Sequence, residues 1–323
     1  MRRPSFFLMN TQHLKKTGIQ SQLDSVFRWT MKSCALLTIV VIVSIFISLF
    51  WQALPALRHF GWRFLTTDVW NPVTSEFGAL SSIYGTLVST VIALILAVPL
   101  GLGIALFLVE LAPPAISRVI GTAIELLAAI PSIIYGMWGL FVFAPFMADH
   151  IQPFLKNNFG FLPFFQGPPM GIGMLTAGII LALMILPYVT SVTRDVFRMV
   201  PGVVKESAYG IGSTTWEVTR KVTIPYGMKG IIGACFLGLG RALGETMAIT
   251  FVIGNNHKIS ASLFEAGNSI ASTLANEFSE ASEPMYVSSL LALGLVLCCI
   301  TFLVQVISQL WLKRLQIRIG RGL

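Results

Sequence analysis

Two charged residues, Arg241 and Glu245, stand within the apolar stretch Gly230–Gly254. A charge near the middle of a bilayer costs about 2.5–3.5 kcal/mol on insertion scales, so an ionisable residue there indicates a function. The planar guanidinium of arginine donates two parallel hydrogen bonds and therefore suits an oxyanion. Residues four apart share one face of a helix, so the two side chains are expected to point together into a helical bundle. The pair predicts a substrate pathway in which Arg241 contacts an anion and Glu245 positions Arg241 or gates the path. A structural ion pair is the alternative.

Few other residues are of a type that could take part in catalysis or binding. Glu125 is the only other acid in a predicted span, and both a functional role and a place near the cytoplasmic boundary stay open for it. The four histidines, at positions 13, 59, 150 and 257, are isolated and lie outside the apolar stretches. An intramembrane enzyme needs a nucleophile with a base, or paired carboxylates, at one depth. We therefore expect no catalytic residue, no metal site and no cofactor bound by this chain.

Composition explains where these residues must be placed. Of 323 residues, 55% are hydrophobic and only 11% are charged, whereas a soluble domain carries about 25% charged residues. A helix crosses the hydrocarbon core of a bilayer in about 20 apolar residues. The sequence predicts an all-α membrane protein whose six transmembrane helices lie in six continuous apolar runs, namely Ser33–Ala53, Phe77–Val109, Ile120–Met147, Gly171–Thr193, Gly230–Gly254 and Pro284–Leu312.

The basic residues predict the orientation of these spans. With the N-terminus in the cytoplasm, seventeen Lys and Arg residues fall in cytoplasmic segments and four in external ones. Basic residues collect on the cytoplasmic side, so we expect both termini there, in a bacterial inner membrane. This placement, rather than nucleic-acid binding, accounts for the net charge of +8. The predicted parts are a cytoplasmic segment 1–32, a first span 33–53, a five-helix core 77–312 with the cytoplasmic loop 194–229, and a tail 313–323.

The loop 194–229 has the pattern of a compact element. Pro201 can open a helix, and Gly210 and Gly212 can end it. Thr214 followed by Glu217 fits a capping box, which predicts a second short helix. Pro225 is expected to close the segment. The loop is therefore predicted to form two short helices joined by a glycine turn.

This loop resembles the "EAA" loop of ATP-binding-cassette importer permeases, with mild departures and intact spacing. The matching residues are Glu206, Ser207, Ala208 and Gly212, then, after nine residues, Val222, Ile224 and Pro225. In that family the loop is the coupling helix that binds the ATPase subunit. The resemblance implies the type I (MetI-like) importer fold and a coupling role for Glu206, Ser207, Ala208, Gly212, Thr215 and Trp216. An ordinary loop with a glycine hinge is the alternative.

From about residue 55 onward the chain resembles the PstC type of phosphate-specific permease. The segments that carry this likeness are Ile83–Thr86, Glu125–Gly136, Gly238–Thr246, Asn268–Ile270 and Leu274–Phe278. The resemblance implies import of inorganic phosphate together with a second, homologous permease (PstA type), an ATPase dimer (PstB type) and an external phosphate-binding protein (PstS type).

The energy source is expected to lie in another chain. The glycines near Arg241 are not followed by the Lys-Ser/Thr of a P-loop, so ATP and Mg²⁺ are expected to be used by the partner ATPase. Physical reasoning alone leaves other oxyanions, such as molybdate, sulfate or phosphonate, open as substrates. An ion-coupled transporter or channel is a further alternative.

Overall fold

The protein, described here by a computed structural model, is almost entirely helical. The backbone is described for residues 18–320 and the side chains for residues 23–314. The expectations for residues 1–17 and 321–323 lie outside the described residues. The chain divides into two units, residues 1–49 and 50–323, which are described separately.

Helix α1 (Gly18–Phe60) contains the first predicted span. It is longer at both ends than the expected Ser33–Ala53, because the residues on either side of the apolar run continue the same helix. Its side chains from Leu23 to Ser48 are exposed. An apolar helix without a buried face is suited to contact with lipid.

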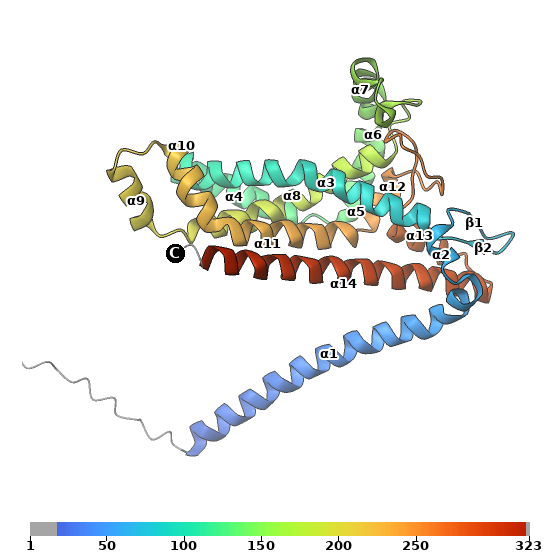
Figure 1. Cartoon of the computed structure of the whole chain (residues 1–323), viewed down its shortest axis with the longest axis horizontal. Coiled ribbons are helices and arrows are strands. Elements are labelled where there is room, and N and C mark those ends of the chain that lie inside the picture. The colour runs from blue at the N-terminus through green and yellow to red at the C-terminus, as the bar shows by residue number, and fades with distance from the viewer. Residues whose placement is uncertain (1–17, 321–323) are drawn as a thin grey trace, which may run out of the picture. The chain divides into compact units, whose positions relative to one another are not determined.

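Residues 50–323 hold the other five membrane-spanning regions. Six helical segments in the described chain, α1 included, are long and apolar enough to cross a membrane. The long helices of this unit run side by side in Figure 1 and pack against one another. They are α3 (Leu80–Leu106), α8 (Met174–Arg198), α11 (Ile224–Leu243) and α14 (Pro284–Gly320).

The third predicted span is broken. Helix α4 (Pro114–Ala128) ends before Pro131, and α5 (Ser132–Trp138) begins after it. Proline has no backbone N–H and disfavours a helical conformation at the residue before it. The helical path then continues as π-helical turns at 139–143 and 147–151, with α6 (Ala144–Phe146) between them, and ends in α7 (Gln152–Phe159).

Helix α8 is the centre of the bundle, and it packs along α3 through small side chains. The buried face of α3 is composed only of glycine, alanine, serine and threonine. In lipid, such faces let helices approach closely. At Gly178 of α8, a Cβ would lie 2.5 Å from Cγ2 of Ile92. The two helices therefore touch at a separation that a methyl group would prevent.

The two ends of the bundle differ. The α9 end carries α9 (Gly202–Gly210), α10 (Thr215–Val218), a π-helical turn at 219–223 and the end of α14 (Figure 1). The opposite end, called the α13 end, carries short elements, several of which share a buried cluster that includes Phe64, Phe77 and Leu290. These elements are α2 (Arg63–Thr66), β1 (Trp70–Asn71), β2 (Glu76–Phe77), a 3-10 turn at 163–165, α12 (Met247–Val252) and α13 (Ile270–Glu277).

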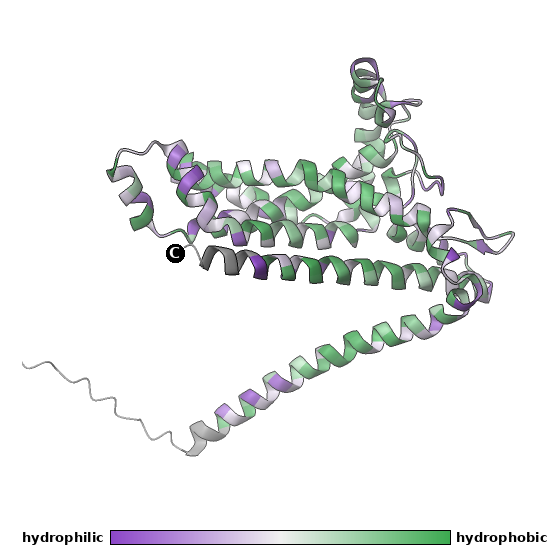
Figure 2. Cartoon of the chain, in the orientation of Figure 1, coloured by the Kyte–Doolittle hydropathy of each residue, from purple (hydrophilic) through white to green (hydrophobic). Residues whose placement is uncertain are grey.

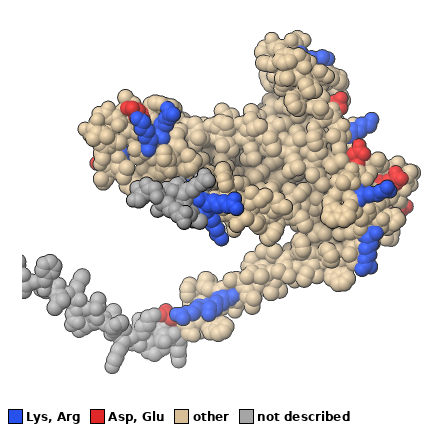
Figure 3. Space-filling model, in the orientation of Figure 1, with Lys and Arg blue, Asp and Glu red and all other residues tan. Residues whose placement is uncertain are grey.

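The β1–β2 pair is antiparallel, with Trp70 opposite Phe77. Figure 2 shows hydrophobic residues along the long helices and hydrophilic residues on α9 and α10. In Figure 3 the charged side chains of the bundle lie toward its two ends and leave an uncharged band between them. This distribution fits a bilayer around the middle of the bundle.

Candidate functional site

Arg241 lies two residues before the end of α11, and its guanidinium rests on an aromatic ring. The guanidinium carbon is 4.4 Å from the centroid of the Tyr188 ring, which belongs to α8. The Nε atom of Arg241 is buried, and no hydrogen-bond partner is found for it among the described residues. A guanidinium whose flat face rests on an aromatic ring keeps the N–H groups at its edges available as hydrogen-bond donors. Arg241 is therefore placed to receive an acceptor such as an oxyanion.

The expectation that Arg241 and Glu245 lie one turn apart on a single helix is wrong. Helix α11 ends at Leu243, and α12 begins at Met247, so Glu245 lies in the break between them. Its Oε1 accepts a hydrogen bond from the backbone N–H of Ala248, at 3.5 Å. Glu245 is buried. Its carboxylate therefore faces the first turn of α12, and no ion pair joins it to Arg241 in the part of the chain that is described.

The break in the third span lies close to Arg241. The hydroxyl of Tyr188 donates to the carbonyl of Ala128 at 3.4 Å, and that of Tyr135 donates to the carbonyl of Leu127 at 3.0 Å. A helix end leaves carbonyls without intrahelical partners, and hydroxyls can satisfy them. Beyond the breaks, α5 and α12 pack against each other. Tyr188 thus connects Arg241 to a second interrupted helix, an arrangement that transporters use at their binding sites.

Sequence reasoning missed both tyrosines. No sequence signal marks them, because the carbonyls that they bind exist as free acceptors only after the third span has broken. Their role depends on contacts between α4, α5 and α8.

Glu125 has a partner on another helix. Its Oε1 lies 2.7 Å from Nη2 of Arg194, in α8. The Arg194 side chain is 9% exposed and that of Glu125 is 55% exposed. The pair joins α4 to the part of α8 nearest the α9 end. Glu125 therefore neutralises a nearly buried arginine, which favours a structural contribution and leaves its functional role a prediction.

The loop 194–229 has the local structure that its sequence predicts, with one exception. Helix α9 begins directly after Pro201, and Gly212 has a φ of +87°. The capping box of Thr214 and Glu217 is present at the start of α10. Pro225, however, does not close the segment. It occupies the first turn of α11, where its missing N–H is tolerated, and a π-helical turn joins α10 to α11 without a gap.

The residues predicted for coupling surround an exposed, partly apolar surface. Glu206, Ser207, Gly212 and Thr215 are exposed, whereas Ala208 is half-buried. Trp216 is 66% exposed, and Ile211, which precedes Gly212 in the same loop, is 85% exposed. Two large apolar side chains exposed on one short loop favour a protein contact there.

A second contact that sequence reasoning missed lies beneath this loop. Glu110 was placed just outside the second span, yet its side chain is buried and pairs with Lys205 of α9. Hydropathy could not reveal this pair, because its two members are far apart in the sequence.

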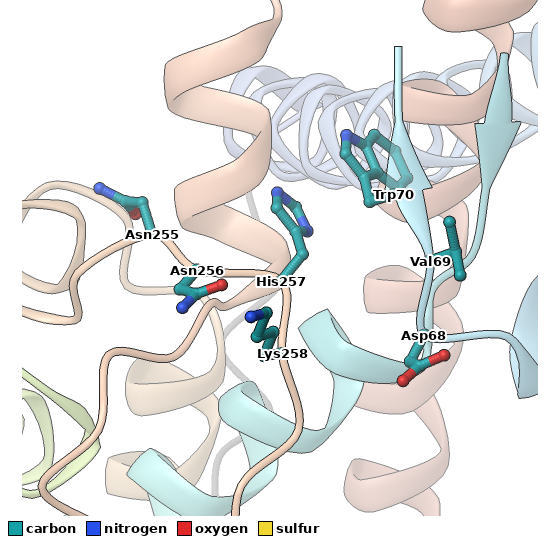
Figure 4. Close-up of a pocket in the computed structure, with 7 residues that line it drawn as sticks. All are labelled: Asp68, Val69, Trp70, Asn255, Asn256, His257 and Lys258. Atoms are coloured by element: carbon teal, nitrogen blue, oxygen red, sulfur yellow. The ribbon is translucent and has the colours of Figure 1, made fainter. Parts of the chain in front are cut away.

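At the α13 end, His257 is not isolated as expected. Its ring stacks on that of Trp70, with centroids 5.6 Å apart and planes 7° apart. The His257 Nε2 atom lies 3.0 Å from Oε1 of Glu277, and Nδ1 lies 2.8 Å from Nδ2 of Asn268. His257 and Trp70 also line an open cavity of about 470 Å³ with Asp68, Val69, Asn255, Asn256 and Lys258 (Figure 4).

Glu277 is the acceptor at the centre of this cluster. Trp70 and Tyr286 both donate to its Oε2, and His257 contacts its other oxygen. Burial raises the pKa of Glu277, but the hydrogen bonds from His257, Tyr286 and Trp70 outweigh it and hold the pKa below its ordinary value. The cluster therefore fixes β1, α13 and the start of α14 around an ionised carboxylate.

Comparison with known proteins agrees with this architecture. The model of the family "binding-protein-dependent transport system inner membrane component" matches residues 97–317. The phosphate transport system permease protein PstC of Mesorhizobium japonicum is 56% identical over 301 residues, which are 92% of this chain and 92% of that protein. The PstC protein of Pasteurella multocida is 51% identical over 303 residues, or 93% and 94% of the two chains.

Solved structures share the fold at low identity. A chain from the crystal structure of a bacterial alginate ABC transporter, in complex with a periplasmic protein bound to alginate pentasaccharide, has a TM-score of 0.62 at 15% identity. That match covers 90% of this chain and 96% of the other. A chain of the inward-facing MetNI methionine ABC transporter has a TM-score of 0.53 at 16% identity and covers 72% and 94%.

The six spans and the two-helix loop between the fourth and fifth define a membrane permease with the type I ABC importer architecture, which confirms the predicted fold class. Such a permease spans the inner membrane several times. The chain belongs to the family of binding-protein-dependent transport system inner membrane components, and within it to the phosphate transport system permeases of the PstC type.

Proposed function

We propose that this chain forms one half of the membrane pathway of an ATP-driven importer of inorganic phosphate, with Arg241 as the residue that contacts phosphate in transit. The observation that carries the proposal is the guanidinium of Arg241, which lies on the Tyr188 ring near the breaks in two helices, with its Nε buried and without a partner among the described residues. The PstC relatives at 50–56% identity support phosphate as the substrate.

The chemistry of the site supports a transient contact. Phosphate accepts parallel hydrogen bonds from a guanidinium, and a low dielectric strengthens them. Glu245 would repel the same anion. Its carboxylate is directed to the first turn of α12, so it holds the break in shape and limits how long an anion stays beside Arg241.

The partners follow from the family and from the exposed surface of the loop. A second, homologous permease of the PstA type completes the pathway, and a PstB-type ATPase dimer binds ATP and Mg²⁺. Trp216 and Ile211 supply apolar contact area to the ATPase, and Glu206 offers an exposed carboxylate. A PstS-type phosphate-binding protein delivers substrate at the α13 end. The chain itself binds no cofactor in this proposal.

The same proposal orients the protein. The α9 end faces the cytoplasm, as do both termini, because the basic residues of the sequence collect in the segments on that side. ATP binding and release then move α9 and α10, and alternating access follows from movement of the broken spans.

The proposal is tested by uptake of radiolabelled phosphate in cells that lack their own high-affinity importer. Arg241→Gln is expected to lower uptake by at least about a hundredfold, since two charge-assisted hydrogen bonds contribute about 1.5–3 kcal/mol each. Arg118→Gln, which removes an exposed arginine of α4, is the matched control. Co-purification with the ATPase shows that each variant assembles.

Three outcomes would overturn parts of the proposal. Normal uptake by assembled Arg241→Gln transporters removes Arg241 from the pathway. Full inhibition of labelled phosphate uptake by equimolar sulfate or molybdate assigns the importer to another oxyanion, and uptake that persists without the ATPase assigns it to ion-coupled transport.

A further inference from the structure

A nearly buried carboxylate lies beneath the loop 194–229. Glu110 belongs to the π-helical turn 107–111 that ends the second span, and its side chain is only 8% exposed. One of its oxygens, Oε1, lies 2.6 Å from Nζ of Lys205 and accepts a hydrogen bond from Oγ1 of Thr223 at 3.0 Å. The Lys205 side chain is 17% exposed.

This single oxygen joins three parts of the chain. Glu110 ends the helical path that begins with α3, Lys205 lies in the middle of α9, and Thr223 precedes the first residue of α11. A movement of α9 that keeps the Lys205–Glu110 contact must therefore move the end of the second span. The contact to Thr223 adds the start of the fifth span to the same unit.

Helix α9 has little else to hold it in place. None of its residues is buried, and its main neighbours in the fold are the short helix α10 and the π-helical turn that follows. A nine-residue helix is marginal by itself in water. Removing one member of a buried ion pair leaves an uncompensated charge in an apolar setting. The position of α9 therefore depends strongly on Glu110 and Lys205.

We propose that Glu110, Lys205 and Thr223 form the link that transmits movement of α9 to the second and fifth spans, with Glu110 and Lys205 as positioning residues for coupling. The inference rests on the proposed function, in which α9 contacts the ATPase. Neither residue touches substrate or nucleotide. Their contribution is to make the loop and the two spans move together when the ATPase moves.

The other ion pairs at this end lack these properties. The Lys221–Glu217 pair lies within the segment from α10 to the following π-helical turn, and both of its side chains are exposed. Glu125 and Arg194 join α4 to α8 without involving α9. Among the described residues, the Glu110–Lys205 pair alone joins α9 to a membrane span through opposite charges.

The test uses the complete importer, reconstituted in proteoliposomes with its ATPase, second permease and phosphate-binding protein. Glu110→Gln keeps the size of the side chain and can still accept from Thr223, but it removes the charge. Lys205→Gln removes the other charge. The double variant Glu110→Lys with Lys205→Glu restores opposite charges in exchanged positions. Lys313→Gln, at an exposed lysine of α14, is the control for loss of one positive charge.

Phosphate uptake and ATP hydrolysis are measured in the same vesicles. Each single variant is expected to lower the number of phosphate ions imported per ATP hydrolysed by about tenfold or more. The charge that has lost its partner is unfavourable in a buried setting, so α9 should move away from the end of the second span. The exchanged double variant is expected to recover most of this ratio, as for residues that interact directly. Lys313→Gln should match the wild type.

The outcomes separate this inference from the proposed function. A crosslink between the Ile211→Cys variant, in an importer without other substitutions in this chain, and the ATPase supports the contact on which both depend, and absence of that crosslink refutes the proposed coupling role of the loop. If the crosslink forms but the single variants import phosphate at the wild-type ratio, the link through Glu110 is refuted. Loss in the single variants without recovery in the exchanged variant also refutes it.

Discussion

Tyr188 offers a sharp test of how Arg241 is held. The Tyr188 ring lies under the guanidinium, and its hydroxyl contacts the carbonyl of Ala128 at the break of the third span. Two substitutions separate these contacts. Tyr188→Phe keeps the ring and removes the hydroxyl, whereas Tyr188→Leu removes the aromatic face and keeps an apolar side chain.

The structure gives the expected size of each effect. At 4.4 Å the ring and the guanidinium are in direct contact, and such a cation–π interaction contributes about 0.5 kcal/mol at exposed sites and about 2 kcal/mol when desolvated. That range corresponds to roughly a twofold to thirtyfold change. The hydroxyl contact of 3.4 Å is near the outer limit of a hydrogen bond. Tyr188→Leu should therefore weaken uptake within that range, and Tyr188→Phe should change it little.

The assay is the concentration dependence of phosphate uptake in proteoliposomes with equal amounts of assembled importer. Without the ring, Arg241 is free to leave the position between the two breaks, so phosphate half-saturation should rise in Tyr188→Leu. Tyr135→Phe, which removes another hydroxyl at the same break, serves as the matched control. Uptake by Tyr188→Leu that equals the wild type would show that the ring does not hold Arg241. An equal loss in Tyr188→Phe would assign the effect to the hydroxyl instead.

Two further predictions concern the ends of the bundle. Gly212 has a φ of +87°, and a Cβ there would meet no atom within 4 Å, so Gly212→Val should cost only backbone strain of about 1–2 kcal/mol. The variant should lower ATP-driven uptake, whereas its helix content, measured by circular dichroism, should stay unchanged. Gly210→Ala is the control. Because the pKa of Glu277 is lower in the folded protein than its ordinary value, the ionised carboxylate stabilises the fold at every pH above that ordinary value. As pH falls through the lower folded pKa this contribution is lost, so the protection factors for hydrogen exchange in α13, which are corrected for the intrinsic pH dependence of exchange, should fall in acid. Glu277→Gln should show lower protection factors at neutral pH and little further acid dependence.

The spans could be predicted from the sequence because the bilayer imposes a simple rule on composition. A charge-free run such as Pro284–Leu312 has few alternatives to a membrane-spanning helix, and α14 contains it entirely. The two helices of the loop were predictable for a local reason, since Pro201 and the Thr214–Glu217 pair act on their own neighbours. Family resemblance then supplied the coupling residues and the substrate. The role of each single coupling residue stays a proposal.

Pro131 marks the break in the third span, but the break in the fifth span and the groups that satisfy the carbonyls freed at the third could not be predicted with the same means. A helix in lipid ends only where other groups take over its hydrogen bonds, and Tyr135 and Tyr188 do so from positions that the sequence does not relate to the break. Pro225 shows the converse, because a proline that was expected to close the loop segment lies in the first turn of α11, within a continuous helical path. Pairs such as Glu110 with Lys205 depend on packing between distant elements, which a hydropathy pattern does not contain.

The face of α3 that meets α8 has a consequence for which substitutions the protein can accept. Its buried side chains are small, and an exchange between serine and alanine is a minor perturbation only where the hydroxyl serves no buried group, unlike Thr86, which accepts a hydrogen bond from the backbone N–H of Ile270. A larger side chain is not tolerated where the helices touch, because a methyl group at Gly178 of α8 would meet Ile92 of α3. Along this contact natural variation is therefore limited by size rather than by hydrophobicity, the reverse of the pattern in the core of a water-soluble protein.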